Sequence, residues 1–353
     1  MDYNNFLHDL LQNLVDQNGS DLHLGVGRKP IIRVDGELII LENYNLLTED
    51  NVWAILQILI DEDRIKIFQE TKNIDFSSNL NNGELQLRGN AYFQRGMLCV
   101  ALRLVSKSKS LEELNLPAVL GDFSRKKQGF FIVVGPVGQG KSTTLSTMIN
   151  LINDERSTHI ITVEDPIEFV YKQNRSIIDQ REIGIDTPDF IKALKSIFRE
   201  DANVIMIGEM RDTATIEVAV TAAETGHLVL STLHTNSASQ TIDRIIDSFP
   251  ANQQNQIRLQ LASSLIGIFS QRLVPCISGG RIPAYELLIN NKAVANLIRE
   301  KRTHEIDTVL ETSSQEGMID MNRCLMDLVR KGEITMENAI QYSLNPKSLE
   351  QLF

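Results

Sequence analysis

The clearest chemical pattern in the chain is a glycine-rich loop between an apolar stretch and a helix-like stretch. Residues 135–142 match G-x-x-x-x-G-K-[ST] without a mismatch, and Lys141 and Ser142 end the pattern. Glycines allow a tight turn in which successive backbone N–H groups face an anion, and the lysine adds positive charge for the β- and γ-phosphates. The serine hydroxyl is the kind of hard oxygen ligand that Mg²⁺ prefers. The pattern predicts a site for a nucleoside triphosphate with Mg²⁺.

The stretches on either side of the loop support this prediction. Residues 130–134 are apolar and rich in β-branched and aromatic types, as in a buried strand. Apolar residues then recur at helical spacing from Leu145 to Ile152, so the phosphates are expected at a helix N-terminus. The residues expected to hold them are Gly135, Pro136, Val137, Gly138, Gln139, Gly140, Lys141, Ser142 and Thr143.

Carboxylates follow two other apolar stretches. Glu164 ends the stretch that begins at His159, and Glu209 follows Val204 to Ile207. In open α/β sheets, ligands bind at the carboxyl ends of strands, so both carboxylates are expected near the phosphate loop. ATP hydrolysis needs a metal, a positioned water and cations near the developing charge. Either glutamate is a candidate for orienting the water.

Glu209 occupies the position of a Walker B carboxylate. The aspartate usual before it is replaced by Gly208, so the metal is expected to be held mainly through Ser142 and water, with Glu209 beside it. His227 and His234 stand at the two ends of the next apolar stretch, residues 228–232. They are candidates for hydrogen bonds to phosphate or carboxylate, and ordinary core or loop histidines are the alternative.

The bulk composition narrows the class of protein. A net charge of −11 disfavours a nonspecific grip on nucleic acid through the whole surface. The three cysteines are scattered, which favours a reducing compartment and gives neither a disulfide framework nor a metal site. With no apolar window of about 18 residues and a polar N-terminus, a soluble cytoplasmic protein is expected, with any membrane contact made through a partner.

The order of the predicted elements indicates an α/β protein of two domains. Residues 1–105 show a helical pattern at 6–15 and several strands joined by turns at Asp35-Gly36 and Asn82-Gly83, as in a small α+β domain. Residues 106–127, rich in charge and serine, are expected to form a linker. Strands and helices alternate in residues 128–353, which indicates a parallel sheet, and helices predominate from Lys292 onward.

Three arginines lie on or beside the N-terminal strands: Arg88, Arg95 and Arg103. A solvated surface is one reading of them. The other is a set of cations directed at the triphosphate of this subunit or of a neighbour.

Several of these segments resemble a known family. Residues 158–169 (THIITVEDPIEF) look like the Asp box of the type II/IV secretion ATPases, residues 204–212 (VIMIGEMRD) like their Walker B motif, and residues 225–234 (TGHLVLSTLH) like their His box. With the phosphate loop, these are four motifs in the family's order. Within that superfamily, nearly the whole chain is most similar to the PilT-like type IV pilus retraction (twitching motility) ATPases.

The resemblance implies a homohexameric ATPase with a PAS-like N-terminal domain and a RecA-like P-loop domain. It implies ATP-driven depolymerisation of a pilus through an inner-membrane platform protein, at the inner face of the cytoplasmic membrane and without nucleic acid. In this family Glu209 is the Walker B glutamate, Glu164 is the Asp-box acid, and both His227 and His234 belong near the nucleotide. Arginines matching Arg88, Arg95 and Arg103 supply charge to the γ-phosphate.

Length and cysteine content favour retraction over the longer extension and type II secretion relatives, which usually carry a four-cysteine metal loop. Residues 293–300 resemble the retraction motif AIRNLIRE, with Ala295 in place of its first arginine. An extension or secretion motor and an accessory retraction ATPase therefore stay as alternatives, and a RecA-type nucleic-acid motor is a further rival. Val137 and Gln139 replace the threonine and serine commoner in the loop, at positions where the backbone does the binding, and are expected to leave nucleotide binding intact.

Overall fold

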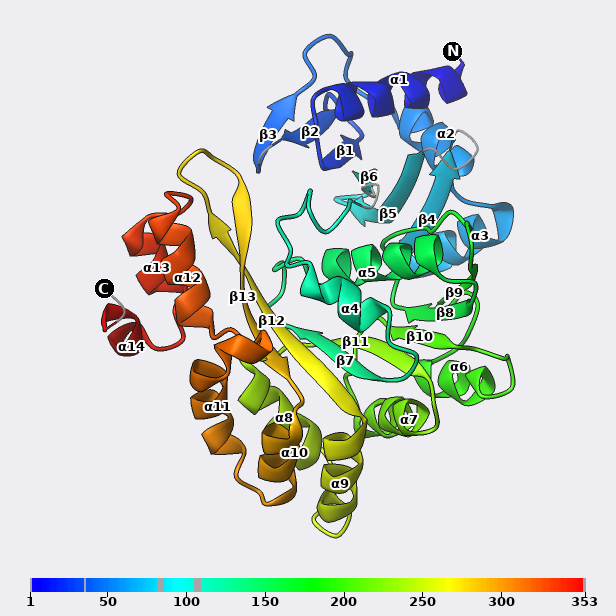
Figure 1. Ribbon diagram of the computed structural model, residues 1–353. Helices are drawn as coiled ribbons and strands as arrows, with labels where there is room; N and C mark the ends of the chain where they lie inside the picture. The colour runs from blue at the N-terminus through cyan, green and yellow to red at the C-terminus, as the bar shows by residue number, and fades with distance from the viewer. Residues whose placement is uncertain (1, 35, 81–84, 105–108, 352–353) are drawn as a thin grey trace. The chain divides into compact units, whose positions relative to one another are not determined.

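The computed structural model describes residues 2–34, 36–80, 85–104 and 109–351. The predicted turn residues Asp35, Asn82 and Gly83 lie outside these ranges, as do residue 105 and the first three residues of the predicted linker, 106–108. The chain forms two compact units that divide between residues 107 and 108. Figure 1 shows the elements of each unit.

The first unit is a six-stranded antiparallel sheet in the order β3-β2-β1-β6-β5-β4 with three helices. Helix α1 buries Leu7, Leu10, Leu11 and Leu14, which confirms the predicted apolar face. Thr48 caps the N-terminus of α2 with a reciprocal pair of hydrogen bonds to Asn51. The elements are α1 (Tyr3–Asp16), β1 (Asp21–Gly25), β2 (Ile31–Val34), β3 (Glu37–Ile40), α2 (Glu49–Leu59), α3 (Glu62–Thr71), β4 (Asn73–Leu80), β5 (Leu85–Gln94) and β6 (Met97–Leu104).

The second unit is built on a seven-stranded sheet in the order β13-β12-β7-β11-β10-β8-β9. The strands from β12 to β9 run parallel, and only the β12–β13 pair within this sheet is antiparallel. Its strands are β7 (Gly129–Val134), β8 (His159–Glu164), β9 (Ile177–Glu182), β10 (Val204–Ile207), β11 (Leu228–Leu233), β12 (Leu265–Pro275) and β13 (Arg281–Ile289). The predicted parallel α/β architecture is confirmed, although β9, β12 and β13 were not anticipated.

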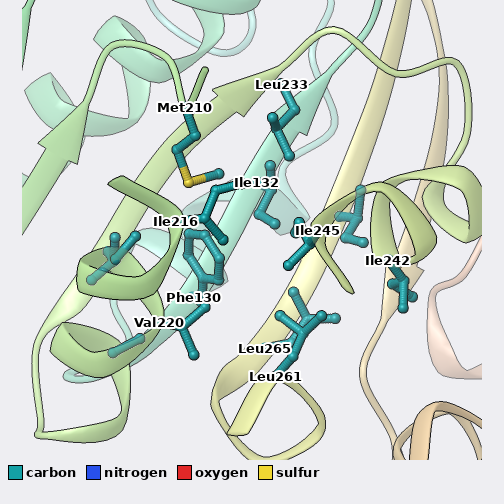
Figure 2. Close-up of a cluster of buried hydrophobic side chains, with 14 of the residues drawn as sticks. Phe130, Ile132, Met210, Ile216, Val220, Leu233, Ile242, Ile245, Leu261 and Leu265 are labelled. Atoms are coloured by element: carbon teal, nitrogen blue, oxygen red, sulfur yellow. The ribbon is translucent and has the colours of Figure 1, made fainter. Parts of the chain in front are cut away.

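Strand β7 is buried on both faces because helices cover both sides of the sheet. Phe130, Ile132 and Val134 belong to one apolar cluster, whereas Phe131 and Val133 belong to another. This division follows from the period of two in a strand, which sends alternate side chains to opposite faces. Figure 2 shows part of the first cluster, in which Phe130 and Ile132 lie among side chains of α7, α8 and α9. Two covered faces explain why β7 is an uninterrupted apolar run rather than an alternating one.

The helices divide between these two faces. The cluster of Phe130 includes residues of α6 (Phe190–Ile197), α7 (Thr213–Glu224), α8 (Ala238–Asp247), α9 (Gln254–Ser264), α10 (Lys292–Arg299) and α11 (Ile306–Thr312). The cluster of Phe131 includes residues of α4 (Val119–Ser124) and α5 (Lys141–Glu155). The α4 helix lies inside the stretch predicted as a linker, and its Leu120 and Phe123 are buried in this second unit. Apolar side chains within residues 116–123 therefore pack into the second unit, whereas the composition predicted that this stretch would be part of a linker.

The chain ends in a helical part, as predicted. Helices α12 (Met321–Arg330), α13 (Met336–Tyr342) and α14 (Pro346–Glu350) share an apolar cluster with Val274 of β12 and with Ile282 and Ala284 of β13. Short 3₁₀ helices at Thr303–Glu305 and Ser314–Glu316 connect the preceding helices. Within the described parts of the chain, no helix combines the length and apolar character needed to cross a bilayer.

Candidate active site

The glycine-rich loop joins β7 to α5 at the carboxyl edge of the sheet. Gly135 has φ +149°, and a Cβ atom at this residue would lie 2.4 Å from the Gln271 carbonyl oxygen, so only glycine fits. Gly138 and Gly140 also have positive φ angles, of +76° and +80°. Helix α5 begins at Lys141, directly after the loop, so its N-terminus faces the place where an anion is expected.

The loop forms one wall of a cleft of about 370 Å³. The cleft brings together the loop, the ends of β8, β10 and β11, and the segments that follow them. Its lining residues are Val137, Gly138, Lys141, Ser142, Leu145, Glu164, Asp165, Pro166, Glu168, Phe169, Tyr171, Met206, Gly208, Glu209, Arg211, Thr232 and His234. The expected Lys141, Ser142, Glu164, Glu209 and His234 therefore line one cleft.

Lys141 is buried at the base of the loop. Its Nζ donates hydrogen bonds to the carbonyl oxygens of Gly135 (2.9 Å) and Pro136 (2.8 Å) and lies 3.3 Å from His234 Nδ1. Burial lowers the pKa of Lys141 to about 8, and the negative charges of Glu209 and Glu168 oppose that shift. The amine is thus held by loop carbonyls that phosphate oxygens can replace as acceptors.

The carboxylate of Glu209 contacts two side chains, those of Arg211 and His234. Its Oε1 forms an ion pair with Arg211, and its Oε2 lies 3.2 Å from His234 Nε2. Arg211 also reaches Asp165, with 3.2 Å between Nη1 and Oδ2. These contacts join the carboxyl ends of β8, β10 and β11, since Asp165, Glu209 and His234 each follow one of those strands directly or by one residue.

Glu164 lies in a different environment. Its side chain is buried, and Oε1 accepts hydrogen bonds from the Thr162 hydroxyl (2.7 Å) and from Gln180 Nε2 (3.2 Å). Burial raises the pKa of Glu164 to about 7, because the low-polarity surroundings disfavour the charged form. The cleft therefore contains one paired carboxylate and one carboxyl that takes up a proton near neutral pH.

The donor set of the cleft fits Mg²⁺ bound with a nucleotide. Mg²⁺ prefers oxygen ligands, keeps several waters and is usually held by one or two protein groups together with phosphates. The Ser142 hydroxyl and the Glu209 carboxylate both line the cleft. No group of three or more histidine, cysteine or carboxylate side chains among the described residues is arranged to hold a metal by itself.

His227 lies at the opposite edge of the sheet, so the expectation that both histidines lie beside the nucleotide is wrong for His227 within the subunit. Its carbonyl accepts a hydrogen bond from Gly129 N at the start of β7, whereas the phosphate loop follows the end of β7. The His227 ring bonds to the Ala222 carbonyl (2.9 Å, from Nδ1) and meets the edge of Phe198. The six residues of β11 separate it from His234.

The three predicted arginines all lie in the first unit. Arg88 of β5 and Arg103 of β6 are directly opposite each other, and Arg103 Nε is 2.8 Å from Asp21 Oδ1. Arg95 has a positive φ of +53° in the turn between β5 and β6. Their action on the γ-phosphate stays a prediction.

Sequence reasoning missed several polar residues in and around the site, among them Arg211 and Gln180. Arg211 follows Glu209 by two residues, and its position just beyond a strand end was a signal that could have identified it. Gln180 comes from β9, which was not predicted, so nothing in its local sequence linked it to Glu164.

Replacing the paired carboxylate tests its part in hydrolysis. In the purified protein, we expect Glu209→Gln to lower kcat for ATP by about 10²-fold or more while ATP affinity changes only a few-fold, because the neutral amide lacks the negative charge of the carboxylate and cannot accept a proton from water. Lys141→Ala is expected to lose turnover together with ATP affinity. The control is Glu217→Gln on the exposed side of α7. Unchanged turnover in Glu209→Gln would remove this residue from the mechanism.

The environment of Glu164 predicts a pH-dependent stability. Its pKa is about 7 in the folded state against an ordinary 4.5, so the folded state binds this proton more tightly, and the free energy of unfolding falls as pH rises between those values. Glu164→Gln removes that loss, on the order of 2–3 kcal/mol above pH 7.

Urea unfolding of the nucleotide-free protein is the measurement for this prediction. Glu164→Gln should be more stable than the wild type at pH 8, and the difference should vanish toward pH 4, below the ordinary pKa of 4.5. Glu311→Gln, on the exposed side of α11, is the control. A stability difference that does not vary with pH would contradict the assignment.

Comparison with known proteins places this site in a family. The family model described as "Type II/IV secretion system protein" matches residues 4–279. The chain is 41% identical over 341 residues to the type IV pilus retraction ATPase PilT of Pseudomonas aeruginosa, covering 96% of this chain and 98% of that protein. It is 43% identical over 322 residues to a twitching motility protein of Neisseria gonorrhoeae, covering 91% and 86% of the two chains.

A solved structure extends this similarity to the fold. The crystal structure of the pilus retraction motor PilT with bound ADP superposes with a TM-score of 0.91 at 43% identity and covers 97% of this chain and 98% of that one. Both units therefore have counterparts in one motor ATPase. The chain belongs to the type II/IV secretion system protein family and is one of its P-loop ATPases.

Proposed function

We propose that this protein is the ATPase motor that retracts a type IV pilus by driving depolymerisation of its pilin subunits, the process behind twitching motility. The observation that carries the proposal is the match to a retraction ATPase along almost the full length of both chains. The match includes the helical part that follows β13, so it is not confined to the nucleotide-binding core.

The cleft supports ATP hydrolysis with Mg²⁺ as the energy source. The loop amides and the N-terminus of α5 bind the phosphates, and Lys141 leaves the loop carbonyls for phosphate oxygens. Ser142 and Glu209 would hold Mg²⁺, which would supply positive charge to neutralise the phosphates. Glu209, held by Arg211, orients the attacking water, and His234 fixes Glu209 and approaches the γ-phosphate.

Glu164 supports this site from the buried side. Its hydrogen bonds to Thr162 and Gln180 fix the end of β8, and its raised pKa makes it the weaker candidate for a base that must be ionised. The environments of the two carboxyl groups therefore support Glu209, rather than Glu164, as the residue that orients the catalytic water.

The assembly is a homohexamer that acts through an inner-membrane platform protein at the cytoplasmic face of the membrane. Arg88, Arg95 and Arg103 add charge to a γ-phosphate in this ring. Arg88 and Arg103 lie directly opposite each other on β5 and β6, which places two of the three arginines side by side in the first unit.

A second candidate is an accessory retraction ATPase. Ala295, at the place of the first arginine of the retraction motif, lies on α10 and is only 8% exposed. A small buried residue cannot make the contact that an arginine at this position would make with a partner.

The number of surface pili after deletion of the gene in the native host separates these functions. We expect excess, nonretracting pili that the wild-type gene reverses and a Lys141→Ala gene does not, because retraction needs ATP turnover. Loss of pili on deletion would contradict the proposal and identify an extension or secretion motor. An unchanged number of pili would favour the accessory function.

A further inference from the structure

The phosphate loop is tied to β12 by hydrogen bonds that involve side chains. Gln271 Nε2 donates to the Gln139 carbonyl oxygen (2.8 Å), and Leu273 N donates to Gln139 Oε1 (2.6 Å). Thr144 on the first turn of α5 donates its hydroxyl to Gln271 Oε1 (2.6 Å). Gln271 and Thr144 are 2% and 1% exposed, so water does not compete for the bond between them. We call Gln139, Gln271, Leu273 and Thr144 the loop strap.

The strap lies where β12 extends beyond the end of its parallel neighbour, β7. The pairing between β12 and β7 ends at Ser270 and Val134, after which the chain of β7 turns into the phosphate loop. Strand β12 continues to Pro275, so beyond Ser270 its backbone N–H and C=O groups on this edge can no longer pair with β7. The Gln139 side-chain oxygen accepts from Leu273 N at this edge and replaces the missing ladder bond.

The same contacts orient the loop backbone. The Gln139 carbonyl and the Gly140 N–H belong to one planar trans peptide, so they point in opposite directions. Because Gln271 holds the carbonyl toward β12, the Gly140 N–H is directed away from β12. A Cβ atom at Gly140 would lie 3.0 Å from Gln271 Nε2, which shows how closely loop and strand approach.

We propose that Gln139 and Gln271 are positioning residues for ATP, which hold the phosphate loop in its binding conformation by fastening it to β12. Gln271 alone bonds both the loop, at Gln139, and the helix after it, at Thr144, so it fixes the two parts of the phosphate site relative to each other. A serine side chain is too short to reach Leu273 N. The glutamine at position 139 therefore contributes to ATP binding, although the sequence pattern predicted that replacing the commoner serine would have no effect.

The purified enzyme tests this role. We expect Gln139→Ser to raise KM for ATP by about three- to ten-fold with kcat within about two-fold, which is the range for losing one hydrogen bond that prepares a site. Gln271→Met, of similar volume but without either hydrogen bond, should raise KM further. Amide hydrogen exchange should quicken within residues 135–144 in both variants and stay unchanged in the other elements of the second unit.

The matched control is Gln256→Ser, the same replacement on the exposed side of α9, which should leave KM and exchange as in the wild type. If Gln139 and Gln271 act through one strap, the double variant should raise KM by less than the product of the two single effects. Unchanged KM and loop exchange in Gln139→Ser would overturn the proposal. Faster exchange throughout the second unit would also overturn it, because the residues would then support the fold rather than the loop. Neither readout depends on the direction of pilus movement.

Discussion

The burial of a lysine ammonium among carboxyl ends of parallel strands is the constraint on which this site depends. A buried charge is costly unless it is paired or hydrogen-bonded, and Lys141 meets that requirement with the carbonyls of Gly135 and Pro136 and with the nearby charge of Glu209. The loop must therefore fold tightly around its own lysine, which positive φ angles at its glycines allow. The same geometry leaves the amine close to the cleft that phosphates would enter.

The charges opposite Lys141 form a connected set. Arg211 bridges Asp165 and Glu209, and His234 lies between Glu209 and Lys141. An entering triphosphate brings negative charge into this set, so we expect the contacts of Arg211 and Lys141 to rearrange. Because Asp165, Glu209 and His234 follow three neighbouring strands, that rearrangement is felt at the end of each strand. Strand β12 lies on the other side of β7 from β11 and contacts the loop through Gln271 and Leu273. It continues to Pro275, whose carbonyl oxygen accepts a hydrogen bond from Asn338 of α13.

The parts of the site that are formed by residues close together in the chain could be predicted from the sequence. The loop pattern needs only a strand before it and a helix after it, so its place at the β7–α5 junction could be predicted, as could the edge on which Glu164 and Glu209 lie. His227 shows where the reasoning failed. At about 3.3 Å per residue, the six residues of β11 span about 20 Å, so the strand length already excluded a shared site for both histidines within one subunit. Gln180 and Gln271 could not be predicted, because their contacts depend on the order of the strands in the sheet. Nothing in the sequences of β9 and β12 indicates which strands lie beside them.

The most direct test of this account is a cryo-EM structure of the protein with Mg²⁺ and a nonhydrolysable ATP analogue. The account predicts phosphate density in the cleft between residues 135–142 and Glu209. Lys141 Nζ should have left the Gly135 and Pro136 carbonyls to lie about 3 Å from a phosphate oxygen. An analogue bound outside this cleft, or a bound analogue with Lys141 still on its loop carbonyls, would contradict the assignment of the nucleotide site.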